Sequence, residues 1–157
     1  MHACPCGYFS DPSRECRCTG AIIQRYLSKV SGPLLDRIDM HIEVPAVAYK
    51  ELRGKDAGAG SAVMRVRVEA ARGIQQSRGF YNARIPSAEL RKLCALDDAG
   101  ERTLEMAVRR MGLSARAHDR ILKVARTIAD LSGAESIAAR HLAEAVQYRS
   151  LDRSYWS

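Results

Sequence analysis

Four of the five cysteines in this 157-residue chain lie within fifteen residues, arranged as two Cys-x-Cys pairs. The pairs are Cys4–Cys6 and Cys16–Cys18, and the stretch between them contains Gly, Asp, Pro and Ser, which favour turns. Two pairs so close in sequence can meet with little loss of chain entropy. They could therefore surround one tetrahedral Zn²⁺ as four thiolates.

Two other uses of these thiols stay open at this point: a disulfide or redox role, and no joint role at all. The spacing suggests a metal site but is not diagnostic of one, because metal-binding loops usually separate their cysteines by two residues and these pairs are separated by one. A reducing compartment disfavours disulfides, so a structural metal is our first hypothesis. The fifth cysteine, Cys94, shares a helical spacing with Leu90 and Leu93 and is expected to be a small core residue.

No complete catalytic or nucleotide-binding motif is present in the sequence. Phosphate-binding glycine loops of both common types are absent, as are the helical zinc-protease motif and the serine nucleophile motif. The four histidines are scattered. From its residues alone, the chain is not expected to form a self-contained active site.

The positive charge is concentrated in the second part of the chain. Residues 1–60 carry 8 Lys and Arg against 7 Asp and Glu, whereas residues 61–157 carry 17 against 11. Of the 25 cations, 20 are Arg, the type suited to bidentate contacts with phosphate or carboxylate. This raises the prospect of a polyanionic partner such as DNA or a nucleotide, although a solvated Arg-rich bundle would have the same composition.

The compartment is expected to be the cytoplasm. No apolar run approaches the ~18 residues that a membrane helix needs, and the first residues lack the features of a signal peptide. We therefore expect no membrane partner.

Residues 1–49 are expected to combine loop, helix and strand. Thr19 is a candidate N-cap for a helix that ends near residue 30. A single turn at residues 34–39 then leads into residues 40–44, whose alternating apolar and polar side chains predict a strand. One strand has no ladder partner of its own. We therefore expect residues 1–49 to be the truncated edge of a larger α/β domain that begins upstream.

Residues 50–60 contain three Gly and no periodicity, which predicts a linker. Residues 61–150 predict a helical bundle with five helices, which begin near residues 61, 86, 98, 114 and 136. Ser114 and Ser136 are the expected caps of the last two. The expected core positions of the first helix are Val63, Val66, Ala70 and Ile74. Residues 151–157 are expected to form a frayed tail. The predicted fold class is mainly α.

Three segments closely resemble the magnesium-chelatase-like family of AAA+ ATPases, in its ComM competence-protein branch. They are CPCGYFSDPSRECRC at 4–18, IQRYLSKVSGPLLDRIDMHIEVP at 23–45 and LSARAHDRILKVARTIADLSG at 113–133. The resemblance implies that residues 1–49 are the end of the nucleotide-binding core, with a Cys-rich insertion, and that residues 61–150 are the helical lid. The ATP- and Mg²⁺-binding Walker A and B segments would lie upstream, so this part should be inactive alone.

The resemblance also implies roles for two arginines. Arg37, in the sequence Leu35-Asp36-Arg37-Ile38-Asp39, matches the arginine finger that reaches the γ-phosphate held by a neighbouring subunit. Arg116 matches the lid sensor arginine that contacts nucleotide. A surface ion pair with Asp36 or Asp39, and a plain surface arginine, are the alternatives for these two positions. His2 stands where the family usually has a polar sensor residue, and no role is transferred to it.

The intact protein, by the same resemblance, would be a ring ATPase, expected to be a hexamer, that remodels DNA by branch migration during transformation and recombination. One alternative is the motor subunit of a magnesium chelatase, although the cysteine insertion favours the ComM branch. Another is a zinc-stapled helical DNA-binding module with no ATPase parent.

Overall fold

The computed structural model describes residues 2, 4–9, 11–45, 47, 49, 53 and 58–149, and over these residues it is mainly helical, as predicted. The tail at 151–157 and most of the predicted linker lie outside the described residues. Within them, the α-helices are α1 (Gly20–Leu27), α2 (Gly32–Leu35), α4 (Ser61–Ser77), α5 (Ser87–Leu93), α6 (Asp98–Met111), α7 (Ala115–Leu131) and α8 (Ala139–Gln147), with a 3-10 turn at Asn82–Arg84.

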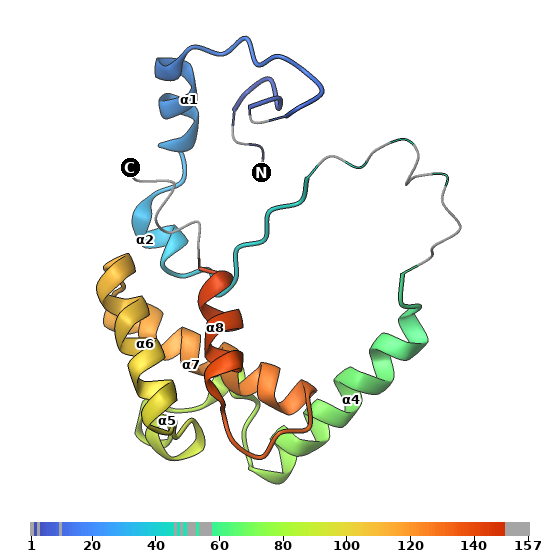
Figure 1. The fold of residues 1–157 in the computed structure, drawn as a ribbon, viewed down its shortest axis with the longest axis vertical. Helices are drawn as coiled ribbons and strands as arrows, with labels where there is room; N and C mark the ends of the chain where they lie inside the picture. Colours follow the sequence, from blue (N-terminus) through green and yellow to red (C-terminus); the bar gives the residue numbers. More distant parts are fainter. Residues whose placement is uncertain are drawn as a thin grey trace.

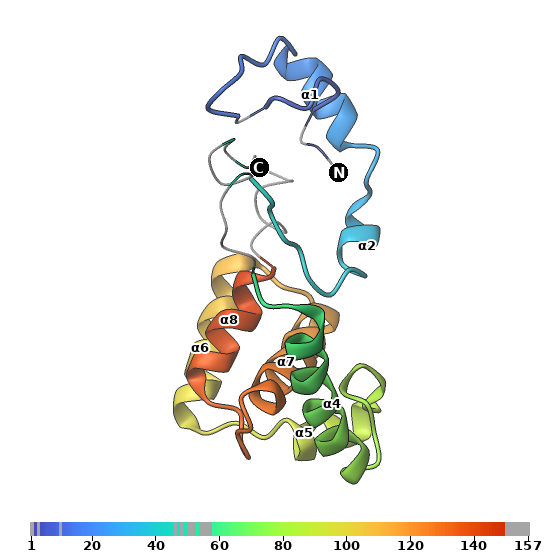
Figure 2. The same cartoon turned by 90° about the vertical axis from the view of Figure 1, so that its right-hand side faces the viewer.

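The elements are arranged along the long axis of the molecule. The cysteine segment and α1 lie at one end, and α4 to α8 form a bundle at the other, with α2 between them (Figures 1 and 2). Within the described part of the chain, no helix combines the length and hydropathy needed to cross a bilayer.

Helix α7 is the centre of the bundle and packs against α4, α5, α8 and the 3-10 turn. Its predicted cap is confirmed, because the Ser114 hydroxyl accepts a hydrogen bond from the Ala117 amide at 3.1 Å. Ile121 and Ala125 of α7 are fully buried in the core cluster. The same core contains Cys94, and burial raises the pKa of its thiol to about 11.

A buried ion-pair network lies beside this apolar core. The side chain of Asp130 is 0% exposed, and its carboxylate pairs with Arg126 at 3.0 Å and with Arg78. The Asn82 side-chain amide donates to the same carboxylate at 2.7 Å. Arg126 uses its remaining donors on two carbonyls of the loop that follows α7. The network therefore fixes the segment after α4 and the loop before α8 onto the end of α7.

The predicted strand at residues 40–44 is wrong for the structure described here. These residues form no strand, and no ladder joins them to another segment within the described ranges. The amide of His41 donates instead to the carbonyl of Tyr148 at 2.7 Å, after the end of α8. Ile42 and Val44 are exposed. Alternating apolar and polar residues thus form a strand only where a sheet is present to pair with them and to bury their apolar side.

The expected core face of α4 is also wrong, although the helix itself lies where it was predicted. Val63 is 59% exposed, Val66 is 67% exposed, and Ala70 and Ile74 are exposed as well. The buried residues are Ala71 and Gln75. Val63 and Val66 are exposed because the first half of α4 extends away from the bundle (Figure 1). In the second half, the face that packs is one residue away from the expected one, so Ala71 and Gln75 are buried in place of Ala70 and Ile74.

The cap of α8 differs from the prediction. The helix begins at Ala139 with Ala138 as its N-cap, so Ser136 lies too early to cap it. Its function is taken over by His141, which is 3% exposed and whose Nδ1 accepts a hydrogen bond from the Ala138 amide at 3.1 Å. Burial lowers the pKa of His141, and the neighbouring Arg140 and Arg126 lower it further, against the opposite influence of Glu144.

We expect Asp130→Asn to lower the free energy of unfolding by about 3–5 kcal/mol, because the change leaves buried cations without their counter-charge. Glu105→Gln is the matched control, since Glu105 pairs with Arg109 on the exposed face of α6 and should contribute no more than ~1 kcal/mol. Chemical denaturation followed by circular dichroism measures both. Equal small losses would show that the network does not stabilise the bundle.

We expect the bundle to lose stability as the pH falls below the ordinary histidine pKa of about 6.5. The folded state keeps His141 neutral, so the unfolded state binds more protons between the lowered and the ordinary pKa. The neutral histidine therefore stabilises the fold fully above that window, and this contribution is lost as pH falls through it. Melting temperatures at pH 7.5 and 5.5 measure the loss, and His141→Asn, which keeps an acceptor, should show a smaller one.

Candidate functional site

The two cysteine pairs come together in one cluster. The sulfur atoms of Cys4, Cys6, Cys16 and Cys18 all lie within 4.8 Å of one another. Cys4 Sγ is 3.3 Å from Cys6 Sγ and 3.8 Å from Cys16 Sγ, and Cys6 Sγ is 3.6 Å from Cys16 Sγ. Four sulfurs at 2.3 Å from a tetrahedral metal would be about 3.8 Å apart. The donor set and its spacing could therefore hold one metal ion.

The thiols of this cluster cannot all ionise easily without a cation. The amide of Tyr8 and the thiol of Cys4 lower the pKa of Cys6 to about 6. The Cys18 amide lowers the pKa of Cys16, but desolvation and the neighbouring sulfurs of Cys6 and Cys4 outweigh it and raise the pKa to about 12. One thiolate forms readily, and each further one is opposed by those already present. A divalent cation would remove this opposition.

The loop that joins the two pairs is held by its own side chains. The carboxylate of Asp11 accepts hydrogen bonds from the Ser13 amide at 2.7 Å and the Ser13 hydroxyl at 2.6 Å, which lowers the pKa of Asp11. Arg14 donates to the Tyr8 hydroxyl at 2.8 Å and lies over its ring. These contacts fix the turn between the pairs, so the thiols are brought together by local structure.

Arg37 lies on a tight turn directly after α2. Its amide donates to the Leu34 carbonyl at 3.0 Å, and the Ile38 amide donates to the Leu35 carbonyl at 3.0 Å. Leu35 is buried, whereas the side chain of Arg37 is exposed. The turn thus anchors its backbone and leaves the guanidinium group accessible to another molecule.

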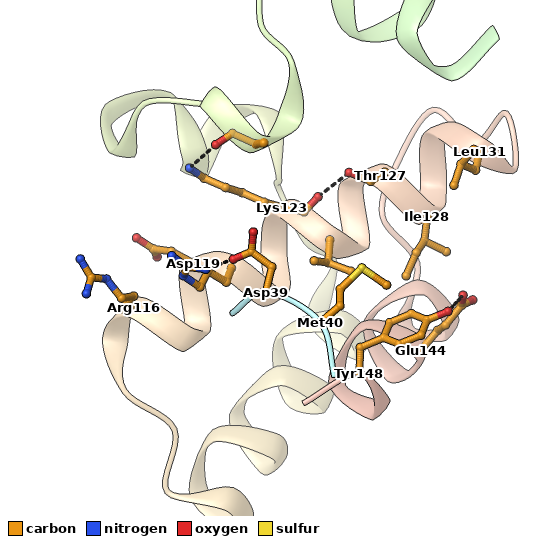
Figure 3. A pocket seen from close by; sticks show the side chains of 13 residues that line it. Asp39, Met40, Arg116, Asp119, Lys123, Thr127, Ile128, Leu131, Glu144 and Tyr148 are labelled. Carbon is orange, nitrogen blue, oxygen red and sulfur yellow. Dashed lines mark hydrogen bonds and ion pairs between the residues drawn. The ribbon is translucent and has the colours of Figure 1, made fainter. Parts of the chain in front are cut away.

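Arg116 lies in the first turn of α7 at the edge of a cavity of about 540 Å³. Figure 3 shows the cavity running along α7, from Arg116 at one end to Ile128 and Leu131 at the other. Cationic side chains and the carboxylates of Asp39 and Asp119 lie toward the Arg116 end, whereas the far part of the wall is mainly apolar and includes the carboxylate of Glu144. The Arg116 side chain is exposed. This arrangement could accept a ligand with an anionic and an apolar part.

Arg37 and Arg116 are connected through a residue that the sequence did not single out. Arg120, one helical turn after Arg116, donates to the Arg37 carbonyl at 2.5 Å and pairs with the Asp39 carboxylate. Arg149, from the segment after α8, donates to the Ile38 carbonyl at 2.5 Å. No spacing signal could have found Arg120 or Arg149, because the partners of Arg120 are 81 and 83 residues away in sequence and that of Arg149 is 111 residues away.

Two family models match the chain. The model described as magnesium chelatase, subunit ChlI C-terminal, matches residues 58–149. The model described as magnesium chelatase, subunit ChlI, matches residues 1–52.

Curated relatives match nearly the whole chain. The competence protein ComM of Haemophilus influenzae is 43% identical over 155 residues, which are 98% of this chain and 30% of that protein. The uncharacterized protein YifB of Escherichia coli is 41% identical over 155 residues, with the same two coverages. An uncharacterized protein of Mycobacterium tuberculosis is 36% identical over 151 residues, which are 93% of this chain and 29% of that protein. The chain thus spans about 30% of the length of these relatives.

Proposed function

The chain belongs to the magnesium chelatase family of AAA+ proteins, in its ComM branch, and we therefore propose that it supplies two nucleotide-contacting arginines to an ATP-hydrolysing ring. The observation that carries the proposal is the exposed side chain of Arg37 on a turn whose backbone is fixed. In this proposal, residues 1–49 end the nucleotide-binding core and residues 61–150 form the lid.

Arg37 acts as the arginine finger of the proposed ring. A guanidinium group can stabilise the charge that develops on the transferring phosphoryl group, an effect of about 10³–10⁵ in rate in other nucleoside triphosphatases. Such a group must reach the neighbouring subunit while its backbone stays in place. An exposed side chain on an anchored turn meets both requirements.

Arg116 contacts the phosphates of ATP in the same proposal. A cation in the first turn of a helix is opposed by the helix dipole, which favours anions there. An incoming polyphosphate would offset that unfavourable position. ATP and Mg²⁺ would be held mainly by phosphate- and metal-binding segments outside this chain, which contribute what its residues lack.

The substrate of the ring is proposed to be DNA, in branch migration during transformation and recombination in the cytoplasm. The support is the name of the competence-protein relative and the net positive charge of residues 61–157. We further propose that the subunits form a ring, since a finger that acts between subunits needs a neighbour, and the resemblance to AAA+ ATPases implies a hexamer.

The four-cysteine cluster is proposed to hold one structural Zn²⁺. Thiolates bind zinc well, as they bind other soft cations. A set of four sulfurs also fills the tetrahedral coordination of zinc, which leaves no position for a substrate and makes the site structural. Chelation would fix the segment before α1, which has few apolar contacts of its own.

We expect Arg37→Ala in the full-length ring protein to lower kcat for ATP hydrolysis by about 10³-fold or more, with nucleotide binding nearly unchanged. The finger matters mainly as charge shifts in the transition state, so ground-state affinity should be retained. Steady-state hydrolysis and titration with a fluorescent ATP analogue measure the two quantities. Arg109→Ala, on the exposed face of α6, is the control and should leave both unchanged.

A mixed ring separates a finger from a structural arginine. Arg37→Ala subunits combined with subunits disabled in the phosphate-binding loop should recover some hydrolysis, at interfaces that pair one intact finger with one intact loop. Normal turnover by Arg37→Ala alone would show that the turn at 34–39 is only structural.

We expect native protein to contain about one zinc per chain and to release it when acid protonates the thiolates. Cys6→Ser should lose the metal to a chelator that the native protein withstands, whereas Cys94→Ala, which changes the core cysteine, should retain it. Elemental analysis after dialysis against the chelator measures the content. A folded, metal-free protein with four freely titrating thiols at the cluster would contradict the zinc proposal.

A further inference from the structure

Four groups from the helical bundle hold the backbone and carboxylates of the turn that carries Arg37. The carbonyl of Arg37 accepts from Arg120, and the carbonyl of Ile38 accepts from Arg149. The Ser114 hydroxyl, at the start of α7, donates to Asp36 at 2.9 Å. The carbonyl of Tyr148 accepts from the His41 amide just beyond the turn, at 2.7 Å. We call residues 36–41 the finger segment.

The contacts from Arg120 and Arg149 are stronger constraints than surface ion pairs. Arg149 is 1% exposed and pairs with Asp36 at 3.8 Å, so its charge is buried and cannot exchange this partner for water at little cost. The side chain of Arg120 is 24% exposed and contacts both the carbonyl of Arg37 and the carboxylate of Asp39. Both contacts are made by Nη1 of Arg120, which therefore joins a backbone carbonyl and a carboxylate of the finger segment.

Arg120 lies one helical turn after Arg116 on α7, and both side chains line the same cavity, which Figure 3 shows from close by. The buried network at the other end of α7 holds the helix in the bundle. Arg116, Arg120 and the finger segment are therefore joined through one helix that is held in the bundle.

Resting on the proposed function, we propose that Arg120 and Arg149 are positioning residues for the Arg37 finger, and that α7 links nucleotide contact at Arg116 to the placement of Arg37. The consequence is that nucleotide bound at the lid of one subunit influences the position of Arg37 in that subunit. Arg37 in turn contacts the nucleotide of the neighbouring subunit. Arg120 lines the cavity, but its Nη1 is engaged by the Arg37 carbonyl and the Asp39 carboxylate, so Arg116 makes the nucleotide contact in this scheme.

The activity test is a double-mutant cycle in the full-length ring protein. Arg120→Ala should lower kcat by roughly tenfold to a hundredfold, the effect of misplacing a catalytic group by about 1 Å, with KM and the affinity for a fluorescent ATP analogue unchanged. In an Arg37→Ala background the same change should have no further effect on kcat. Arg120→Lys, which keeps a donor and a charge, should restore part of the rate, and Arg109→Ala should leave it unchanged.

The second arm needs no activity and uses the chain described here. Arg120→Ala should raise amide hydrogen exchange over the finger segment by about tenfold, while the amides of the buried part of α7 stay as protected as in the native chain. Arg149 is fully buried, so its removal could unfold the chain. Arg149→Lys keeps the charge and should still raise amide hydrogen exchange in the finger segment.

Each outcome separates the inference from the function on which it rests. Normal hydrolysis by Arg37→Ala would contradict the proposed function and, with it, the role of the positioning residues. An inactive Arg37→Ala beside a fully active Arg120→Ala would overturn this inference alone. So would unchanged exchange over the finger segment, or a loss of kcat by Arg120→Ala that is equally large without Arg37.

Discussion

The buried carboxylate of Asp130 determines how the helical part of the chain is held together. A charge with no exposure to water requires partners, and here they come from α7 itself and from the segment after α4. Arg126 approaches from one turn earlier on α7, while Arg78 and Asn82 approach from the segment after α4. Arg126 also donates to the loop that precedes α8. One carboxylate thus joins two connections of the bundle to α7, directly or through Arg126, and the apolar core lies against it.

This constraint leaves the two ends of α7 with different tasks. Its second half is committed to the core, so its position cannot follow a ligand independently of the bundle. Its first half begins at Ser114, and there Arg116 and Arg120 face the cavity rather than the core. Cations near a helix N-terminus are opposed by the dipole. Arg120 offsets this with Asp39 and the Arg37 carbonyl, whereas the exposed Arg116 is placed to meet an anion that arrives with a ligand.

Sequence patterns predict the parts of this structure that neighbouring residues decide. The cap at Ser114 and the position of α4 depend on residues a few positions apart. The errors concern coverage by distant elements. Periodicity identifies an apolar face on α4 but not that its first half projects beyond α7, and the alternation at residues 40–44 cannot supply the missing sheet. The contacts of Arg120 and Arg149 are beyond any local pattern for the same reason.

Several arginines of the basic part of the chain are engaged in internal contacts. The excess of cations in residues 61–157 suggests a polyanionic partner when counted along the sequence. In the structure, Arg78 and Arg126 serve the buried carboxylate, while Arg120 and Arg149 serve the finger segment. These four charges are part of the fold and are not a surface for nucleic acid. Support for a DNA interface must therefore come from exposed arginines, such as Arg65 and Arg67 on the projecting half of α4, where a phosphate backbone could be reached without breaking an internal ion pair.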